Sequence, residues 1–435
     1  MTISKFSELG LADPIQRALT SRNHLVPTPI QAGSIPQLLE GRDMLGIAQT
    51  GTGKTGAFAL PILHKLSRNN DGSSRNARAL ILAPTRELAI QIGDEFRAYG
   101  QYLHLRQTLI YGGVSQKPQV SGLQRGVDII IATPGRLLDL MNQRFVKLNA
   151  IEFLVLDEGD RMLDMGFIRD IRKIVAVLPK QRQTLLFSAT MPNEIARLSG
   201  DILNNPVRVE VTPQATPIES IEQSVYYINS KAKSGLLSTL LEDKALSRVI
   251  VFTRTKHRAN RVAEHLEKTG VSADAIHGNK SQGARQRALK RFRDGDARVL
   301  VATDVAARGI DIDGVTHVIN YEIPNEADSY VHRIGRTARA GASGIAVAFC
   351  DSTERGYLRD IEKLIKRRLA VIGEEPAPGT FESEPEKPQG RGRGGPRSNA
   401  NNNSRPNNAG NGPAKKRNRS RSRKRPGGSS ERAAA

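Results

Sequence analysis

The chain is organised around the run Ala48-Gln49-Thr50-Gly51-Thr52-Gly53-Lys54-Thr55. An apolar run at 44–47 precedes it, and a helix-like segment at 56–66 follows it. A strand, a glycine-rich loop and a helix in this order predict a phosphate-binding loop, whose glycines let backbone N–H groups face an anion. Lys54 would supply charge for the outer phosphates, and the Thr55 hydroxyl could bind Mg²⁺. The alternative is a glycine-rich turn with an incidental lysine, since Ala48 replaces the first glycine of the usual pattern.

Short apolar runs alternate with amphipathic segments over most of the chain. This alternation is typical of a parallel sheet covered on both faces by helices, so we predict an α/β fold. A stretch with three prolines at 206–220 interrupts the pattern and separates two α/β sets. The predicted strands are 44–48, 79–83, 107–111, 128–132, 153–157 and 184–188 in the first set, and 224–228, 248–252, 298–302, 317–320 and 344–349 in the second.

The domain organisation follows from these breaks. We predict a first domain at 1–205, an interdomain linker at 206–220, a second domain at 221–372 and a tail at 373–435. The tail is rich first in Glu and Pro and then in Gly, Asn, Ser, Pro and Arg, a composition that buries too little apolar surface to fold. We therefore expect an acidic-then-basic, disordered tail.

Positive charge is concentrated at the end of the chain. Residues 387–435 hold fourteen Lys and Arg against one Glu, so they carry +13 of the formal +21 and leave +8 on the rest. Such a balance indicates a polyanionic partner, most simply nucleic acid. A tail that only aids solubility, or a nuclear-import signal in a nucleated cell, are the alternatives.

Composition also limits the classes of protein to which this chain can belong. The 435 residues, 38% of them hydrophobic, leave room for two or three domains. Cys350 is the only cysteine, which excludes an intrachain disulfide and a cysteine-based metal site. No apolar run reaches membrane-spanning length, and residues 1–10 lack the pattern of a signal peptide. We expect a cytoplasmic protein, or a nuclear one if the source has a nucleus, without a membrane partner.

The run Leu-Val-Leu-Asp-Glu at 154–158 is the second chemical element, an apolar strand that ends in two carboxylates. If this strand ends beside the phosphate loop, Asp157 reaches the Mg²⁺ shell and Glu158 can orient and deprotonate the attacking water. Two exposed acids in a strand-to-helix loop are the alternative. Paired with the phosphate loop, the two acids indicate a catalytic site.

At 157–160, Asp-Glu-Gly-Asp, the chain resembles the DEAD-box ATP-dependent RNA helicases, two-domain enzymes of superfamily 2. The resemblance runs from Phe6 to about Gly341, and its motifs stand in one order. They are 27–31, the phosphate loop, 84–89, 112–113, 133–136, 188–190, 251–252, Gln282 with Arg285, 302–311 and 332–339. The core and its basic tail look most like the bacterial RhlE-type branch. The chain departs from the family pattern at Asn23-His24, Gly159 and Ala338.

The resemblance implies two tandem RecA-like domains that use ATP and Mg²⁺. Phe6 would stack on adenine and Gln31 would read its edge, although Gln31 could equally cap a helix. Residues 49–55 would hold the phosphates and Asp311 the ribose. Arg336 and Arg339 would act as arginine fingers from the second domain. The residues implied to couple the sites are Asp160, Ser188, Thr190, His332 and Arg333.

The resemblance further implies binding to the sugar-phosphate backbone of RNA without regard to sequence. The implied contacts are Thr85, Arg86, Gly112, Gly113, Thr133 and Arg136 in the first domain and Arg254 and Thr303 in the second. The expected activity is RNA-stimulated ATP hydrolysis with local duplex unwinding. An ATP-gated clamp or RNA chaperone that unwinds weakly is one alternative, and a nucleic-acid-binding protein with a degenerate ATPase is another. We expect a monomer, with ribosome-assembly or RNA-decay factors as candidate partners.

Overall fold

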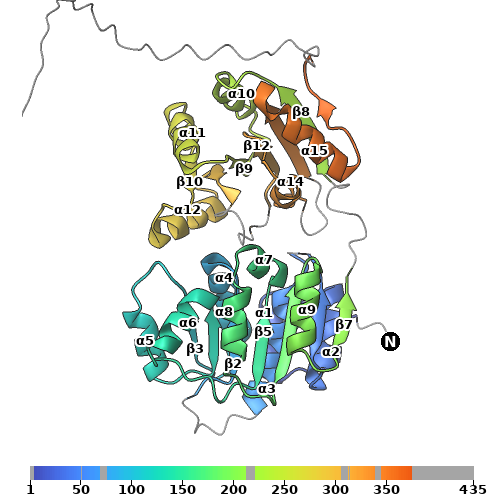
Figure 1. Ribbon diagram of the computed structural model, residues 1–435, viewed down its shortest axis with the longest axis vertical. Helices are drawn as coiled ribbons and strands as arrows, with labels where there is room; N and C mark the ends of the chain where they lie inside the picture. Colours follow the sequence, from blue (N-terminus) through green and yellow to red (C-terminus); the bar gives the residue numbers. More distant parts are fainter. Residues whose placement is uncertain are drawn as a thin grey trace, which may run out of the picture. The chain divides into compact units, whose positions relative to one another are not determined.

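The computed structural model describes residues 4–49, 51–68, 76–211, 221–304, 312, 314–338 and 344–374. It contains two seven-stranded parallel sheets flanked by helices (Figure 1), both within Met1–Ser383. The α/β class with two RecA-like sheets is thereby confirmed. No helix among the described residues is long and apolar enough to cross a membrane. The predicted tail from residue 375 onward, and 212–220 of the predicted linker, lie outside the described residues.

The first sheet has the strand order β3-β4-β2-β5-β6-β1-β7. Its inner strands are buried on both faces, which explains why they read as continuous apolar runs. The carboxyl ends of parallel strands share one edge, so the segments after β1 and β5 open at the same edge. The strands are β1 (Met44–Ile47), β2 (Ala79–Leu82), β3 (Gln107–Ile110), β4 (Ile129–Ala132), β5 (Phe153–Leu156), β6 (Gln183–Ser188) and β7 (Val207–Glu210).

Helices cover both faces of this sheet because successive strand residues point to opposite sides. In β2, Ile81 joins the core under one set of helices and Leu80 the core under the other. The first set comprises the 3₁₀ helix η1 (Phe6–Leu9), α1 (Asp13–Ser21), α2 (Pro29–Leu39), α3 (Lys54–Arg68) and α4 (Arg86–Tyr99). The second comprises α6 (Pro134–Asn142), α7 (Gly159–Asp164), α8 (Ile168–Val175) and α9 (Asn193–Ile202), while α5 (Lys117–Gln124) follows β3.

The second sheet repeats the arrangement with the order β10-β11-β9-β12-β13-β8-β14. Its strands are β8 (Ile221–Tyr227), β9 (Val249–Phe252), β10 (Ala273–Ile276), β11 (Val299–Ala302), β12 (His317–Asn320), β13 (Gly344–Cys350) and β14 (Ala370–Val371). Helices α10 (Lys233–Leu240) and α11 (Lys256–Lys268) pack on one face. The other face carries α12 (Gln282–Asp294), α14 (Ala327–Ile334) and α15 (Arg355–Ile365), the last preceded by the 3₁₀ helix η2 (Ser352–Glu354).

Three strands were not predicted from the sequence. The first, β7, lies inside the range predicted as linker, yet it pairs in parallel with β1 and so belongs to the first sheet. It is an edge strand with alternating half-buried and exposed residues, and it lacks the apolar run that marks the inner strands. The others, β10 and β14, are also edge strands, and β14 has only two residues. Short edge strands carry little apolar signal.

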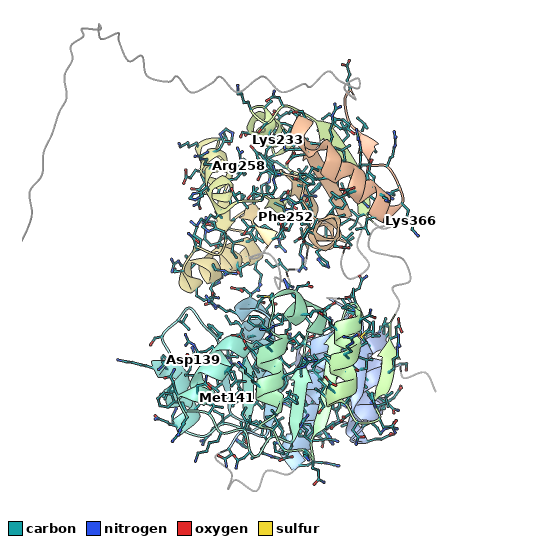
Figure 2. The ribbon with its side chains drawn as sticks, in the orientation of Figure 1. Asp139, Met141, Lys233, Phe252, Arg258 and Lys366 are labelled. Atoms are coloured by element: carbon teal, nitrogen blue, oxygen red, sulfur yellow. The ribbon has the colours of Figure 1, made fainter. Side chains whose placement is uncertain are left out.

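A buried charged cluster holds the carboxyl end of β13 in the second domain. Lys233, labelled in Figure 2, is 1% exposed, and its Nζ donates to the Glu354 carboxylate. The same Nζ lies 3.2 Å from both Asp351 Oδ2 and the Phe349 carbonyl oxygen. Burial raises the pKa of Glu354 although Lys233 acts against it. Buried charges persist only when paired in this way.

Candidate functional site

The phosphate loop joins β1 to α3, and its glycines are required by the backbone. Gly51 and Gly53 have φ of 85° and 89°, in the left-handed region that favours glycine. A Cβ on Gly53 would lie 2.7 Å from Gln31 Nε2 and 2.8 Å from Thr28 Oγ1. Close packing and backbone conformation therefore both demand glycine. Of the predicted loop residues, Thr50 lies outside the described part of the chain.

The charged end of the loop fits a polyphosphate. Lys54 is the first residue of α3 and is buried, and its Nζ donates to the Ala48 carbonyl oxygen at 3.0 Å. A neutral carbonyl is a weaker partner for an ammonium than a phosphate oxygen. Backbone N–H groups at the start of α3 add donors for the same anion. Thr55, the predicted Mg²⁺ ligand, follows Lys54 directly as the second residue of α3.

Asp157 and Glu158 follow β5 and are 2% and 5% exposed. Burial raises the pKa of Asp157 to about 6, with the Glu158 charge adding to the rise and the Lys54 charge opposing it. Burial would also raise the pKa of Glu158, but the charges of Arg161, Lys54 and Arg336 outweigh it and the net shift is downward. Glu158 is therefore ionised at neutral pH, as a group that accepts a proton must be.

Glu158 is also held in a fixed conformation. Its φ is 54°, uncommon for a residue with a side chain, at the junction between β5 and α7. Its Oε2 accepts a hydrogen bond from Arg161 Nη1 at 2.9 Å. The role of Arg161 was missed in the sequence, although its spacing of three residues from Glu158 on a helix is typical of a pair in contact.

A magnesium ion would need ligands from more than the protein. The described residues contain no group of three or more His, Cys, Asp or Glu side chains that could hold a metal. Mg²⁺ usually takes one or two carboxylates and completes its shell with waters and substrate phosphates. One carboxylate, Asp157, with the Thr55 hydroxyl, therefore fits a Mg²⁺ bound together with a nucleotide.

Asp160 connects the acidic motif, residues 157–160, to the segment after β6. Its Oδ2 accepts hydrogen bonds from the backbone N–H of Ala189 (3.1 Å) and from the N–H (2.8 Å) and hydroxyl (3.0 Å) of Thr190. The Asp160 N–H donates to Ser188 Oγ at 3.1 Å. Asp160 therefore contacts residues 188–190 directly, while the coupling role implied for Asp160, Ser188 and Thr190 stays a prediction.

Gln31 and Phe6, predicted to bind adenine, are both engaged with the protein. Gln31 Oε1 accepts from the Thr28 N–H at 2.9 Å and closes a capping box at the start of α2. Gln31 Nε2 donates to the Gly53 carbonyl oxygen at 3.0 Å, which links α2 to the phosphate loop. The Phe6 ring is buried in the core beside Leu9. The helix-cap alternative for Gln31 is confirmed, and adenine recognition stays a prediction.

The RNA-binding residues predicted in the first domain gather at one edge of its sheet. They follow the adjacent strands β2, β4 and β3, at the same carboxyl edge as the phosphate loop. A Cβ on Gly113, whose φ is 76°, would overlap the Arg86 guanidinium, so Arg86 lies directly against this glycine. The full set at this edge is Thr85, Arg86, Gly112, Gly113, Thr133 and Arg136.

In the second domain, Arg333 is a buried anchor. It is 1% exposed and makes a two-pronged contact with Asp304, Nε to Oδ1 at 2.6 Å and Nη2 to Oδ2 at 2.7 Å. Its Nη1 donates to Asn320 Oδ1 and to the Glu322 carbonyl oxygen. It therefore ties α14 to the carboxyl ends of β11 and β12.

Among the other residues predicted for this domain, Arg254, Arg336 and Thr303 are described by the structure. Arg254 forms ion pairs with Glu354 (3.1 Å) and Glu322 (3.9 Å), so its charge is already partly compensated. Arg336 is buried and its Nε donates to the His332 carbonyl oxygen. Thr303 is buried at the end of β11. Asp311 and Arg339 lie outside the described residues.

Sequence reasoning noted Gln282 and Arg285 as a motif but did not find their partner. Both contact Glu87, the residue after Arg86 in α4, with Gln282 Nε2 at 2.9 Å and Arg285 Nη2 at 3.1 Å from its Oε1. Gln282 and Glu87 lie 195 positions apart in the chain. No local pattern could have revealed this contact.

Comparisons with known proteins agree with this geometry. Residues 28–198 match the DEAD/DEAH box helicase family and residues 232–341 match the helicase conserved C-terminal domain. The chain is 46% identical to the ATP-dependent RNA helicase CshA of Listeria monocytogenes over 370 residues, 85% of this chain and 70% of that protein.

Solved structures show the same fold. A structure of S. cerevisiae Dbp5 bound to RNA and ADP BeF3 matches with a TM-score of 0.74 and 32% identity, covering 85% of this chain and 95% of that one. Mss116p bound to ssRNA and AMP-PNP matches with a TM-score of 0.75 and 29% identity, covering 86% and 79%. The RhlE-type branch stays a prediction.

Proposed function

The chain belongs to the DEAD-box ATP-dependent RNA helicases, and from this premise we propose that it couples ATP binding and hydrolysis to local, sequence-independent unwinding or remodelling of RNA duplexes and ribonucleoproteins. One observation carries the proposal. The phosphate loop after β1 and the carboxylates after β5 open at one edge of the first sheet, close enough for the Lys54 charge to oppose the rise in the pKa of Asp157 and to contribute to the lowered pKa of Glu158.

The residues divide the chemistry of hydrolysis between them. The phosphate loop and Lys54 bind the phosphates of ATP, and Thr55 with Asp157 would hold Mg²⁺, which would neutralise phosphate charge. Glu158, ionised and oriented by Arg161, positions a water molecule and accepts its proton. Arg336, together with Arg339, stabilises the charge that develops on the transferred phosphoryl group.

RNA binding in this proposal rests on backbone contacts. Thr85, Arg86, Gly112, Gly113, Thr133 and Arg136 offer hydroxyl, guanidinium and backbone N–H donors, with Thr303 and Arg254 in the second domain. Such donors recognise phosphate and sugar and carry no base information. Dbp5 and Mss116p, the solved relatives, bind RNA and single-stranded RNA respectively, which supports the assignment.

ATP turnover with and without RNA tests the proposal. Lys54→Ala should abolish turnover because the phosphates lose their cation, and Glu158→Gln should bind ATP and RNA yet fail to hydrolyse. Glu194→Gln is the matched control, because it makes the same chemical change at an exposed position of α9. Wild-type turnover in the Glu158→Gln variant would refute the assignment. Strand displacement on blunt and tailed duplexes then separates a helicase from an ATP-gated clamp or RNA chaperone, which would hydrolyse ATP but displace little strand.

The basic tail extends the proposal to RNA capture. A polycation tethered to the enzyme raises the local RNA concentration and adds phosphate contacts without specificity. Deleting residues from Pro388 onward should weaken RNA affinity and flatten its dependence on salt, while turnover at saturating RNA stays unchanged. Equal affinity of the two proteins across the salt series would exclude the tail from RNA binding. A cytoplasmic location, a monomeric state and ribosome-assembly or RNA-decay partners complete the proposal.

A further inference from the structure

A polar pocket of about 370 Å³ lies at the amino ends of β1 and β6 in the first domain. Its walls come from the residues before β1 (41–43), the segment that leads into β6 (180–184) and the turn after α9 (202–205). The phosphate loop follows the other end of β1, and a four-residue strand spans roughly 13 Å. None of the pocket residues belongs to the nucleotide or RNA site described above.

The pocket carries a surplus of positive charge. Arg42, Lys180 and Arg182 line it together with one acid, Asp43. Asp43 is only 8% exposed, and both its oxygens accept backbone hydrogen bonds, Oδ1 from the Thr184 N–H at 2.8 Å and Oδ2 from the Asn204 N–H at 2.7 Å. Its carboxylate is therefore occupied in joining the walls. Three cations against this one acid leave a net charge of +2 for an incoming group.

The walls are preformed. Asp43 connects β1, β6 and the turn after α9, and its carbonyl oxygen accepts from the Val207 N–H at 2.8 Å, which adds β7. Arg182 is fixed by hydrogen bonds from Nε to Thr184 Oγ1 (3.1 Å) and from Nη1 to the Pro179 carbonyl oxygen (2.7 Å). A site whose donors are already oriented loses little conformational entropy when a ligand binds.

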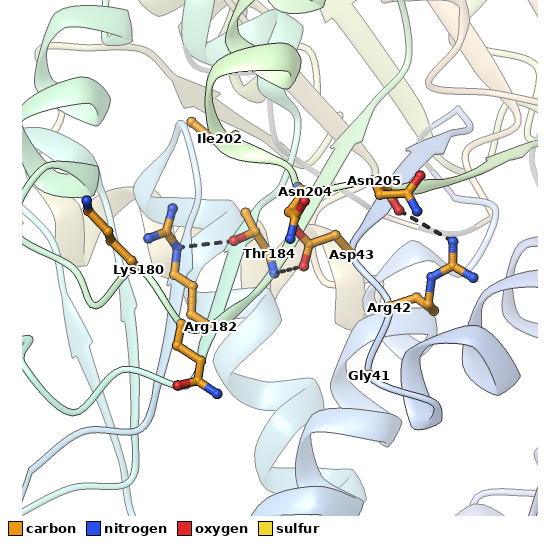
Figure 3. A pocket seen from close by; sticks show the side chains of 10 residues that line it. Gly41, Arg42, Asp43, Lys180, Arg182, Thr184, Ile202, Asn204 and Asn205 are labelled. Atoms are coloured by element: carbon orange, nitrogen blue, oxygen red, sulfur yellow. Dashed lines mark hydrogen bonds between the residues drawn. The ribbon is translucent and has the colours of Figure 1, made fainter.

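The donors that face the pocket remain available. Among the described residues, no hydrogen-bond partner is found for Arg182 Nη2 or for the Lys180 ammonium. Figure 3 shows Lys180 and Arg182 on one side of Asp43, and Arg42, which donates to the Asn205 carbonyl oxygen at 3.4 Å, on the other. Cationic side chains therefore line the pocket on both sides of Asp43.

We propose that this pocket binds a phosphate group. A forked guanidinium and a lysine ammonium match the several oxygens of a phosphate, and the amides of Asn204 and Asn205 add neutral donors. The lining contains no aromatic side chain on which a base could stack, and Ile202 is its only large apolar residue. Recognition therefore falls on the phosphate itself. The phosphate belongs either to an RNA segment other than the strand at the carboxyl edge, or to a free phosphorylated small molecule.

Calorimetric titration with pyrophosphate tests the site. The full chain is first saturated with ADP and Mg²⁺, so that the phosphate loop does not take up the probe. Arg42→Gln/Lys180→Gln removes two exposed cations of the pocket and should weaken pyrophosphate binding about tenfold or more, because two charge-assisted contacts are lost. Arg169→Gln/Lys173→Gln, on exposed positions in α8 of the same domain, is the control of equal charge and should bind as the wild type does.

Two further measurements identify the source of the phosphate. If the pocket variant also loses affinity for a long hairpin RNA but not for a short single strand, the source is RNA backbone. If both RNAs bind normally while pyrophosphate binding is lost, the source is a free phosphate. ATP turnover should stay at the wild-type level in either case, which keeps this test separate from the proposed function.

Three results would overturn the inference. They are absence of pyrophosphate binding to the wild-type chain, equal binding by the pocket variant, and a polyglutamate peptide that occupies the pocket more tightly than pyrophosphate. The last result would assign the pocket to an acidic protein partner.

Discussion

Replacing Asp160 with alanine should detach the segment after β6 from the acidic motif. One carboxylate oxygen, Oδ2, accepts three hydrogen bonds from Ala189 and Thr190, at 2.8 to 3.1 Å. A hydrogen bond to a charged acceptor contributes about 1.5–3 kcal/mol where it is buried. Ala189 and Thr190 are exposed, so water replaces part of each bond, and we expect a total loss of roughly 3 kcal/mol.

Asp160→Asn provides the graded comparison. If its amide oxygen faces the three donors of residues 189 and 190, these bonds survive as neutral ones. The amide nitrogen then faces the Arg161 N–H, which loses the acceptor it has at 2.9 Å in Asp160 Oδ1. This orientation loses one bond, whereas the Ala variant loses all four, so the Asn variant should lose only about 1 kcal/mol.

Amide hydrogen exchange at residues 189 and 190 measures the detachment directly. A loss of about 3 kcal/mol corresponds to exchange faster by roughly two orders of magnitude in the Ala variant, with a much smaller change in the Asn variant. If Asp160 couples ATP to RNA, strand displacement per ATP hydrolysed should fall in the same order. Unchanged protection of both amides in the Ala variant would refute the structural argument. Lost protection with normal strand displacement would refute the coupling role alone.

Three further outcomes are expected. Glu158→Gln should keep ATP and RNA affinity while turnover falls at least about a hundredfold, because the proton acceptor is gone; nucleotide-binding and steady-state assays check both halves. Lys233→Met should lower the free energy of unfolding by about 3 kcal/mol in urea, because Glu354 and Asp351 lose their buried cation and Glu354 keeps only the partly exposed Arg254 as an ion-pair partner. A loss below about 1 kcal/mol would contradict the buried pair. Gly159→Ala should change turnover by about threefold or less. An added Cβ would lie 2.8 Å from Leu186 Cδ1, the movable end of a side chain, so a small packing cost offsets the gain in helix propensity. A large gain in turnover would mean that this position tunes the rate.

Prediction from sequence succeeded where the signal is local. The inner strands of both sheets lie within three residues of their predicted ends, because strands buried on both faces must be continuous apolar runs. The edge strand β7 escaped because none of its residues is fully buried, β10 because two of its four residues are only half-buried, and β14 because it has only two residues. Their places are decided by pairing with a neighbour, and β7 shows this by extending the first sheet into the predicted linker.

The site divides in the same way. Local sequence patterns were enough to locate the phosphate loop, the carboxylates after β5 and the order of the motifs, because each depends on residue types a few positions apart. The folded structure was needed to show that Gln31 donates to the Gly53 carbonyl oxygen, that Arg333 is buried against Asp304 and that Glu87 pairs with Arg285. These contacts join residues 22, 29 and almost 200 positions apart, and chain spacing carries no information about them. Their geometry follows from the packing of whole elements against one another, which also forms the basic pocket at the opposite edge of the first sheet.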